Sequence, residues 1–600
     1  MAVEFMSRRN LSFVLYELFD AEQLTKHACY EEHSWETFEA IIDVAEQIAR
    51  EKFYPHLAAS DAREPVMVDG KVAMIPEIRE AVAAYAEAGF LAAHHSTELG
   101  GIQLPRMISL ACQVWFSAAN IPTTSYVGLT KAAANVIEAF GTPEQKRRFL
   151  PPMLDGRCFG TMILTEPQAG SSLADIATTA VPTKEGHYLI KGNKIFISAG
   201  EHELSENIVH LVLARIKGAP AGVKGLSLFI VPRYRVNPDG SPGEENDVAL
   251  AGLIHKMGWR GTTSTMLNFG ENDRCHGYLI GEPNKGLACM FHMMNEARIN
   301  VGMGATMLGY AGYLYSLDYA RNRPQGRRAG NSDPTSKQVM LIEHADVRRM
   351  LLMQKSYVEG CFALGFYAAW LLDQQKSSPD DGVRREAGLL LDILTPIIKA
   401  WSSELCIEAN SQAIQVLGGY GYTRDYPVEQ YFRNNRLNPI HEGTNGIQAI
   451  DLLGRKISMQ GGAAFRLLTR EIAKTVAEAD GEEALRGLAQ ELREALQTVE
   501  ETTALLLAKR EEAGTDLFLA NASLYLAMVG HVVIAWMWLR QAVAATRKGA
   551  TATGSNQEFY RGKLQACRYY FRWELPKIRY QGRILGGLDT TCHAMDDTWY

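Results

Sequence analysis

The sequence predicts an α+β multidomain protein in which a helical domain, a β domain, a helical bundle and a further helical domain follow one another. Three observations predict this order. With 600 residues, the chain exceeds the length that one hydrophobic core supports. Apolar residues recur at helical spacing up to about residue 155 and again from about residue 285. Between them lie short segments rich in β-branched residues. The expected boundaries are 1–35 for an N-terminal extension, then 36–157, 158–280, 281–458 and 459–600.

The first helical domain contains two clear helix signals. Residues 37–53 place apolar side chains on one helical face, namely Ile41, Ile42, Ala45, Ile48 and Phe53. Further along, Thr142 precedes Pro143 and Glu144, which predicts a helix with Thr142 as its N-cap and proline at its first position.

The β domain is predicted from five short segments: CFGTMILT, HYLIKGNKIFIS, NIVHLVLARI, GLSLFIVPRY and STMLNFG. Turn residues separate such segments, and we expect turns at Lys191-Gly192-Asn193 and at Pro238-Asp239-Gly240.

The two later domains show helical periodicity. In 298–323, Ala305, Gly309 and Gly312 form a small-residue face that suits close helix packing or the approach of a cofactor. Residues 484–510 predict an amphipathic helix. Residues 517–539 carry no formal charge and are long enough to cross a bilayer. Polar residues interrupt this segment, so we expect a buried helix and no transmembrane segment.

The composition excludes several classes of protein. A net charge of −7 argues against general affinity for nucleic acid. None of the nine cysteines forms a C-x-x-C pair, so neither a metal site nor a disulfide framework is expected. The first ten residues lack the apolar run of a secretory signal. We therefore expect a cytoplasmic protein, with peripheral attachment to a membrane left open.

Two segments of the β domain could hold a cofactor. In Leu164–Ser172 (LTEPQAGSS), a strand is followed by a loop that offers backbone N–H groups and hydroxyls, which suits a carbonyl-bearing ring or a phosphate. In Lys194–Gly200 (KIFISAG), Phe196 and Ser198 share one face of a strand. A surface turn and a half-buried strand are the plainer interpretations.

Two segments of the bundle complete the pattern. In Gln415–Tyr422 (QVLGGYGY), paired glycines allow a turn or a close ligand approach, or cap a helix. In Asn438–Arg455, Glu442 is followed by Gly-Thr-Asn-Gly, which places a carboxylate on a loop beside free N–H groups. Base catalysis at a carbon acid needs such a carboxylate, with donors for the developing oxyanion.

These four segments, in this order, resemble the acyl-CoA dehydrogenase family, and the resemblance covers about residues 38–455. It implies a helical domain, a β-barrel-like middle domain and a helical bundle. The extension from about 460 to 600 is similar to that of a bacterial long-form subgroup of about 600 residues. The resemblance also implies FAD, an acyl-CoA substrate, electron-transfer flavoprotein as acceptor, and a homodimer.

The resemblance assigns roles residue by residue. Glu442 matches the catalytic base. The positions matching flavin contacts are Met162, Leu164, Thr165, Gly170, Ser171, Phe196, Ile197, Ser198, Arg323, Gln325, Gln415, Gly418, Gly419, Thr444 and Gly446. Those matching substrate contacts are Ser171, Asn295, Arg298 and Gly443. Arg323 and Gln325 match a motif that reaches the flavin of a neighbouring subunit, but Gly326 follows directly where the family often has Phe-Gly.

Some members of the family carry the base at a different place, just before the helix arginine. That position is Ala297 here, and the adjacent Glu296 points about 100° away around the helix. Glu442 is therefore the expected base.

The implied reaction is α,β-dehydrogenation of a fatty acyl-CoA, of medium-to-long chain, within fatty acid β-oxidation. The alternatives are an acyl-CoA oxidase and a methylmercaptopropionyl-CoA dehydrogenase. A DNA-protecting flavoprotein is an alternative of a different class, because residues 561–583 contain seven Lys or Arg. A solvated helix face is the preferred explanation of these charges.

Overall fold

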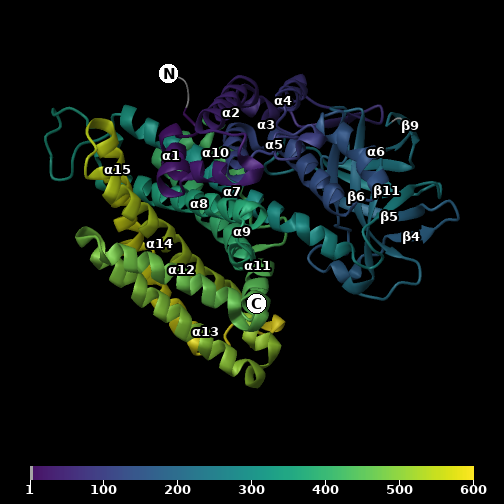
Figure 1. The fold of residues 1–600 in the computed structure, drawn as a ribbon. Helices are drawn as coiled ribbons and strands as arrows, with labels where there is room; N and C mark the ends of the chain where they lie inside the picture. Colours follow the sequence, from purple (N-terminus) through teal and green to yellow (C-terminus); the bar gives the residue numbers. More distant parts are fainter. Residues whose placement is uncertain (1–3, 239) are drawn as a thin grey trace. The chain divides into compact units, whose positions relative to one another are not determined.

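The computed structural model describes residues 4–238 and 240–600, and the backbone alone for residues 292–295. The chain divides into two compact units, which we call the N-unit (Trp35–Ala297) and the C-unit (Met1–Ser34 with Arg298–Tyr600). The N-unit contains helices and the large sheet, and the C-unit is helical, so the predicted α+β class is confirmed (Figure 1).

The helices of the N-unit are α2 (Trp35–Ile48), α3 (Leu57–Ala62), α4 (Pro76–Glu87), α5 (Arg106–Phe140) and α6 (Pro143–Leu154). The segment predicted over 37–53 is α2 followed by a π-helical turn, Ala49–Phe53. The predicted cap on α6 is confirmed, because Thr142 accepts a hydrogen bond from the Gln145 N–H at 3.2 Å and Gln145 returns one at 2.9 Å.

The sheet of the N-unit closes on itself. Its strands are β3 (Cys158–Ile163), β4 (Thr179–Pro182), β5 (Tyr188–Ser198), β6 (Asn207–Ile216), β7 (Leu226–Pro232), β10 (Val248–Leu253), β11 (Ser264–Phe269) and β12 (His276–Ile280). Pairing runs from β5 through β12, β7, β6 and β4 back to β5, a ring of strands that gives the expected barrel-like domain. Two short hairpins, β1–β2 (Val66–Val68, Lys71–Ala73) and β8–β9 (Tyr234–Val236, Pro242–Glu245), lie outside it.

The turn expected at Lys191-Gly192-Asn193 is wrong, because β5 runs through all three residues. A Cβ atom on Gly192 would lie 2.3 Å from the hydroxyl of Thr178. The glycine therefore serves close packing inside the domain, which the sequence pattern does not distinguish from a turn. The turn expected at Pro238-Asp239-Gly240 includes Asp239, which lies outside the described residues.

The helices that follow are α7 (Gly286–Asn322), α8 (Ala345–Ser377), α9 (Asp381–Leu417), α10 (Val428–Asn435) and α11 (Asn445–Asp451). The short α1 (Arg8–Ser12) belongs to the same unit as α8–α11. Cβ atoms on Gly309 and Gly312 would lie 3.0 Å and 2.6 Å from the side chains of Cys406 and Asn410 on α9. The small-residue face of α7 therefore serves helix packing.

The last region consists of α12 (Ala463–Asp480), α13 (Arg486–Ala520), α14 (Ala522–Gly549), α15 (Gly554–Trp573) and α16 (Ile578–Gly586). Figure 1 shows α12–α15 running side by side. The uncharged segment 517–539 is not one helix, because α13 ends at Ala520 and α14 begins at Ala522. Helix α14 is long and apolar enough to cross a membrane, but 83% of its most apolar window is buried inside the protein.

A buried polar network joins the two ends of the chain inside the C-unit. The Lys563 Nζ on α15 donates to Asn10 at 2.5 Å, to Glu359 on α8 at 2.8 Å and to Gln541 on α14 at 2.8 Å. Lys355 also contacts Glu359. The N-terminal segment is thus held by hydrogen bonds to the last helices.

Candidate active site

Glu442 lies in the short loop between α10 and α11, in an unusual backbone conformation. Its φ is +53°, in the left-handed region, and the following Gly443 has φ +81°. Such a conformation costs a non-glycine residue about 1–3 kcal/mol and persists only where the surroundings impose it. Here Gln448 on α11 donates to the carbonyl oxygens of Glu442 and Gly443, at 3.2 Å and 3.4 Å. Thr444 caps α11 by accepting from the N–H of Ile447 at 3.3 Å.

Burial and the neighbouring positive charges act on the pKa of Glu442 in opposite directions. Burial raises the pKa of the Glu442 carboxyl, whereas Arg298 and then Lys399 lower it. Burial also lowers the pKa of Lys399 to about 7. The net result is a carboxyl whose pKa lies above its ordinary value, which suits a base that works near neutral pH.

Both cations beside Glu442 have partners that hold them in place. Lys399 donates to the Asn445 side chain at 3.0 Å. Arg298 pairs with Asp451 at 3.3 Å, and Asp451 pairs with Arg455 at 2.7 Å. The Nε of Arg298 is buried and has no hydrogen-bond partner among the described residues. This leaves one donor of a buried guanidinium available beside the base.

Glu296, the carboxylate next to Ala297 on α7, is already engaged. It pairs with Arg106 at 2.8 Å and accepts from the Asn135 side chain at 2.8 Å, both within the N-unit. Ala297 packs against the core of that unit. The predicted substrate contact Asn295 lies outside the residues whose side chains are described.

In the N-unit, a buried ion pair joins the loop 164–172 to strand β5. Lys194 and Glu166 lie 2.8 Å apart, with 0% and 2% of their side chains exposed. Lys194 also donates to the carbonyl oxygens of Leu164 and Leu213, and Glu166 accepts from Ala177 and Thr178. Burial alone would raise the pKa of Glu166, but these partners lower it to about 2. The pair holds the two predicted cofactor segments together.

Strand β5 presents Phe196 and Ser198 to the outside, as its alternation predicts. Phe196 is 61% exposed and has φ +59°. The pairing with β11 shifts register beside it, between Thr265 and Leu267, which marks a β-bulge. The Ile197 side chain, in contrast, is buried in the core, so it leaves only backbone atoms for a ligand.

The remaining predicted flavin contacts of the N-unit differ in exposure. Gly170 and Ser171 lie on the exposed loop, and a Cβ on Gly170 would meet no atom within 4 Å. Thr165 is partly exposed, and its carbonyl oxygen accepts from the N–H of Ile195 at 3.0 Å. Leu164 is partly exposed, whereas Met162 is buried among core residues.

The predicted nucleotide contacts of the C-unit are exposed. Gly418 has φ +62°, and Cβ atoms on Gly418 and Gly419 would meet nothing within 4 Å, which leaves the backbone open to a ligand. The Arg323 guanidinium lies 5.4 Å from the ring centroid of Tyr420, two residues beyond Gly418. Gln325 and Gln415 are exposed, and Gly446 lies in the first turn of α11. These residues fit the phosphates and sugar of a dinucleotide.

Sequence reasoning missed the roles of Lys399, Asn445 and the pair Glu166–Lys194. A signal was present for the charged residues. Lys399 is the one charged residue in the apolar stretch LTPIIKAW of α9, and Glu166 and Lys194 each stand inside a predicted cofactor segment. Such charges within apolar or functional segments are buried only when they have partners.

Four family models match the chain in succession. Three describe the acyl-CoA dehydrogenase N-terminal domain (36–157), middle domain (161–271) and C-terminal domain (284–457). The fourth describes an acetyl-CoA dehydrogenase C-terminal-like domain (468–596).

Three relatives match nearly the full length. A 3-methylmercaptopropionyl-CoA dehydrogenase of Ruegeria pomeroyi is 35% identical over 93% of each chain. A butyryl-CoA dehydrogenase of Syntrophomonas wolfei is 34% identical over 95% of each. A broad-specificity linear acyl-CoA dehydrogenase of Mycobacterium tuberculosis is 33% identical over 98% of each.

Two solved structures resemble this one. An acyl-CoA dehydrogenase complexed with FAD from Bacillus anthracis has TM-score 0.73 at 21% identity, over 96% of this chain and 91% of that one. Caenorhabditis elegans ACDH-11 in complex with C11-CoA has TM-score 0.75 at 17% identity, over 95% and 91%. At these identities the likeness shows a common fold.

Proposed function

Since the chain belongs to the acyl-CoA dehydrogenase family, we propose that it oxidises an acyl-CoA thioester to the trans-2-enoyl-CoA, with Glu442 as the base. FAD, when bound, would supply the acceptor for the β-hydrogen and its electron pair. The assignment rests on the different environments of two carboxylates, Glu442 and Glu296. Glu442 is held in a strained loop with a raised pKa, whereas Glu296 is bound by Arg106 and Asn135.

Glu442 takes the α-proton, and the chain supports this step in two ways. The cations Arg298 and Lys399 stabilise the ionised carboxylate before the reaction. The left-handed turn at Glu442 and Gly443, held by Gln448, fixes the direction of the carboxylate.

Two sets of residues are proposed to bind FAD. The N-unit set is Thr165, Gly170, Ser171, Phe196 and Ser198, with the backbone of Ile197; the C-unit set is Arg323, Gln325, Gln415, Gly418, Gly419, Thr444 and Gly446. Exposed glycine backbone, hydroxyls and a guanidinium are the groups that bind phosphates. The exposed ring of Phe196 offers a surface for the flavin ring.

We propose straight-chain acyl-CoA substrates of medium to long chain, with electron-transfer flavoprotein as acceptor and a cytoplasmic homodimer as the active form. A second candidate is methylmercaptopropionyl-CoA oxidation, favoured by the 35% identical relative from Ruegeria pomeroyi. Turnover against straight-chain acyl-CoAs of increasing length and against methylmercaptopropionyl-CoA separates the two. Peroxide formation without an added acceptor would indicate an oxidase instead.

The DNA-protecting alternative receives little support from residues 561–583. Lys563 is buried against Glu359, Lys577 pairs with Glu574 at 2.6 Å and Arg561 pairs with Glu558 at 2.7 Å. Part of the positive charge that suggested this alternative is therefore paired with carboxylates of the protein, and Lys563 is buried. Salt-dependent binding of duplex DNA would support the DNA-protecting alternative.

The test of the base is Glu442→Gln, followed by anaerobic stopped-flow bleaching of the flavin. Glutamine keeps the shape but accepts no proton, so flavin reduction should slow by about 10²–10⁴-fold or more, while FAD and acyl-CoA binding persist. Glu296→Gln is the control and should retain near-normal reduction. Fast reduction in Glu442→Gln, or loss of reduction in Glu296→Gln, would show that the base is elsewhere.

A further inference from the structure

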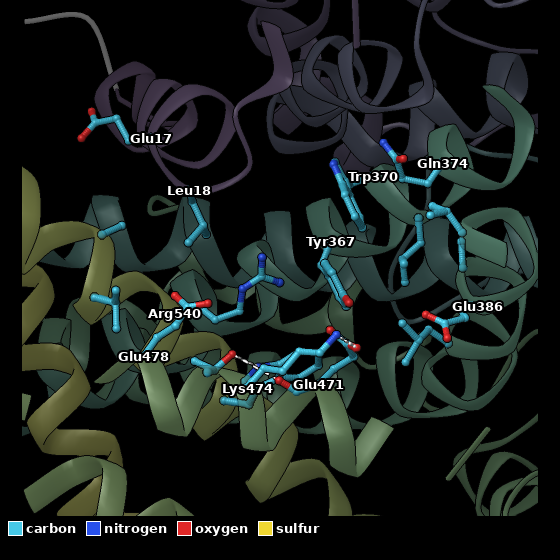
Figure 2. Close-up of a pocket in the computed structure, with 18 of the residues that line it drawn as sticks. Glu17, Leu18, Tyr367, Trp370, Gln374, Glu386, Glu471, Lys474, Glu478 and Arg540 are labelled. Carbon is cyan, nitrogen blue, oxygen red and sulfur yellow. Dashed lines mark hydrogen bonds and ion pairs between the residues drawn. The ribbon is translucent and has the colours of Figure 1, made fainter. Parts of the chain in front are cut away.

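A cavity of about 460 Å³ lies within the C-unit, apart from the residues named for the active site (Figure 2). Its walls come from the π-helical turn η1 (Phe13–Leu18) and from helices α8, α9, α12 and α14. Its volume falls in the range of about 300–1,000 Å³ that is usual for small-molecule sites. The cavity therefore brings together the N-terminal segment, the bundle and the last helical region.

The guanidinium of Arg540 projects into this cavity from α14 (Figure 2). It lies 4.8 Å from the ring centroids of Phe19 and Tyr367, and 5.8 Å from that of Trp536. Among the described residues, Arg540 has no carboxylate within ion-pair distance and donates no hydrogen bond. Aromatic faces stabilise the cation but leave its N–H donors unused.

The carboxylates that line the cavity do not neutralise Arg540, because each is matched to another group. The pairs are Glu17 with Arg9 (2.7 Å) and Tyr560 (2.6 Å), Glu386 with Arg470 (2.8 Å), Glu471 with Lys474 (2.6 Å), and Glu478 with Arg547 (3.8 Å). Burial lowers the pKa of Arg540, and Tyr367, Glu478 and Glu471 oppose this effect from a distance. An anion bound at Arg540 would use the N–H donors of the guanidinium that no lining carboxylate engages.

Part of the wall is apolar or aromatic. Tyr367 and Trp370 stack with centroids 5.9 Å apart and planes 11° apart. Leu371, Val383, Ala387 and Leu390 line the same cavity. A ligand that fills it would therefore carry an apolar body as well as a charged head.

We propose that this cavity binds an amphiphilic oxyanion, a carboxylate or phosphate ester with an aliphatic body, whose head group is held by Arg540. A guanidinium offers two parallel N–H donors, which match the oxygens of either head group. The ligand would contact the N-terminal segment, the bundle and the last helices at once. Binding thus stabilises the packing of these three parts of the C-unit.

The proposal is tested on the FAD-loaded enzyme by calorimetric titration and by thermal unfolding. The probes are octanoate, octyl phosphate, octanol and inorganic phosphate. At least one of the two amphiphilic anions should bind and raise Tm, and whichever binds more tightly identifies the head group. Octanol and inorganic phosphate should bind far more weakly, because each lacks one half of the ligand.

Two variants and one control locate the binding. Arg540→Gln should weaken it by roughly tenfold or more, the cost of losing a charge-assisted hydrogen-bond pair. Ala544→Phe leaves Arg540 in place but fills the cavity, and should also remove binding. Arg561→Gln changes an exposed arginine of α15 that does not line the cavity, and should alter affinity by no more than roughly twofold.

The proposal is overturned if neither anion binds the wild type, if octanol binds as tightly as the better of the two anions, or if a folded Arg540→Gln or Ala544→Phe protein retains wild-type affinity. Should Arg540→Gln fail to fold, Ala544→Phe still decides the question. Turnover of acyl-CoA by each variant shows that the active site is intact, so a failure here is distinct from a failure of the proposed function.

Discussion

Lys399 places a titratable positive charge beside the base. Its partners are Asn445, which it contacts at 3.0 Å, and the carboxylate of Glu442, which it influences through space. Burial lowers the pKa of Lys399 to about 7, so it is charged on the acidic side of neutrality and loses its charge above that pH. Lys399 therefore lowers the pKa of Glu442 most strongly on the acidic side of neutrality, where Glu442 begins to take up a proton.

Lys399→Met should move the acidic limb of the kcat/KM profile to higher pH. The lysine charge lowers the pKa of Glu442, so its removal raises that pKa, and the base is then ionised only at higher pH. A nearby opposite charge accounts for about 1–3 pH units. Lys456→Met removes another buried lysine, paired with Asp392, and serves as the control. An unmoved limb, or a shift to lower pH, would exclude the role of Lys399.

At the scale of the element, strand β5 carries two ion pairs of opposite kind. Lys194–Glu166 is buried and ties the loop 164–172 to the strand, whereas Lys191–Asp273 lies on the surface with 60% and 71% of the side chains exposed. Removing one partner of a buried pair leaves an uncompensated charge, which costs about 3–5 kcal/mol. An exposed pair contributes about 0–1 kcal/mol.

Lys194→Met should therefore lower Tm strongly and reduce FAD retention after gel filtration, because the loop loses its anchor. Lys191→Met, on the same strand, should change both measurements little. Flavin content and Tm would be read from the same samples. Normal flavin content in a folded Lys194→Met protein would show that the loop is positioned by other contacts.

Local signals predicted the elements well where the deciding contact is near in sequence. Thr142 caps α6 through Gln145, only three residues away, and the alternation of β5 exposes Phe196 and Ser198. The expectation failed where the contact is distant. Gly192 packs on Thr178 and so continues a strand, and the break at Asn521 interrupts an apolar run that reads as one helix. The sequence around Lys399 predicts only a core position, because its contact with the loop of Glu442 joins residues more than 40 positions apart.

At the scale of the whole molecule, Arg323 is proposed to reach the flavin of a neighbouring subunit. It is exposed and lies beside Tyr420. Arg323→Ala should lower flavin occupancy and dimer stability together, since a charge-assisted phosphate contact is lost. Absorbance of the bound flavin and sedimentation velocity measure the two effects. Arg328→Ala, which removes an exposed pair with Glu343, is the control, and an unchanged sedimentation profile in Arg323→Ala would count against a shared site.

Helix α14 makes the last region part of the protein core. Trp536 donates to Thr475 on α12 and Trp538 to the Ser356 carbonyl on α8, both at 2.8 Å. A Cβ on Gly530 would lie 2.5 Å from Trp401 on α9. Deletion of 459–600 would therefore uncover the apolar faces of α8 and α9, and the shortened protein should aggregate.

The full chain should stay in the supernatant after ultracentrifugation without detergent. Its sedimentation with membranes would contradict the buried position of α14.

The hydrogen bond between Asn10 and Lys563 joins residues 553 positions apart. A ribosome adds about 5–20 residues per second, so Asn10 emerges on the order of a minute before its partner exists. The N-unit, encoded between these ends, can fold during that interval from its own continuous stretch of chain. The hydrogen bond from Lys563 cannot form until synthesis is nearly complete, although the N-terminal segment can meet α8 earlier, where Phe19 stacks on Tyr367. Completion of the buried network is then a late step of maturation, and a nascent chain that stalls before α15 leaves Asn10 and Glu359 without Lys563.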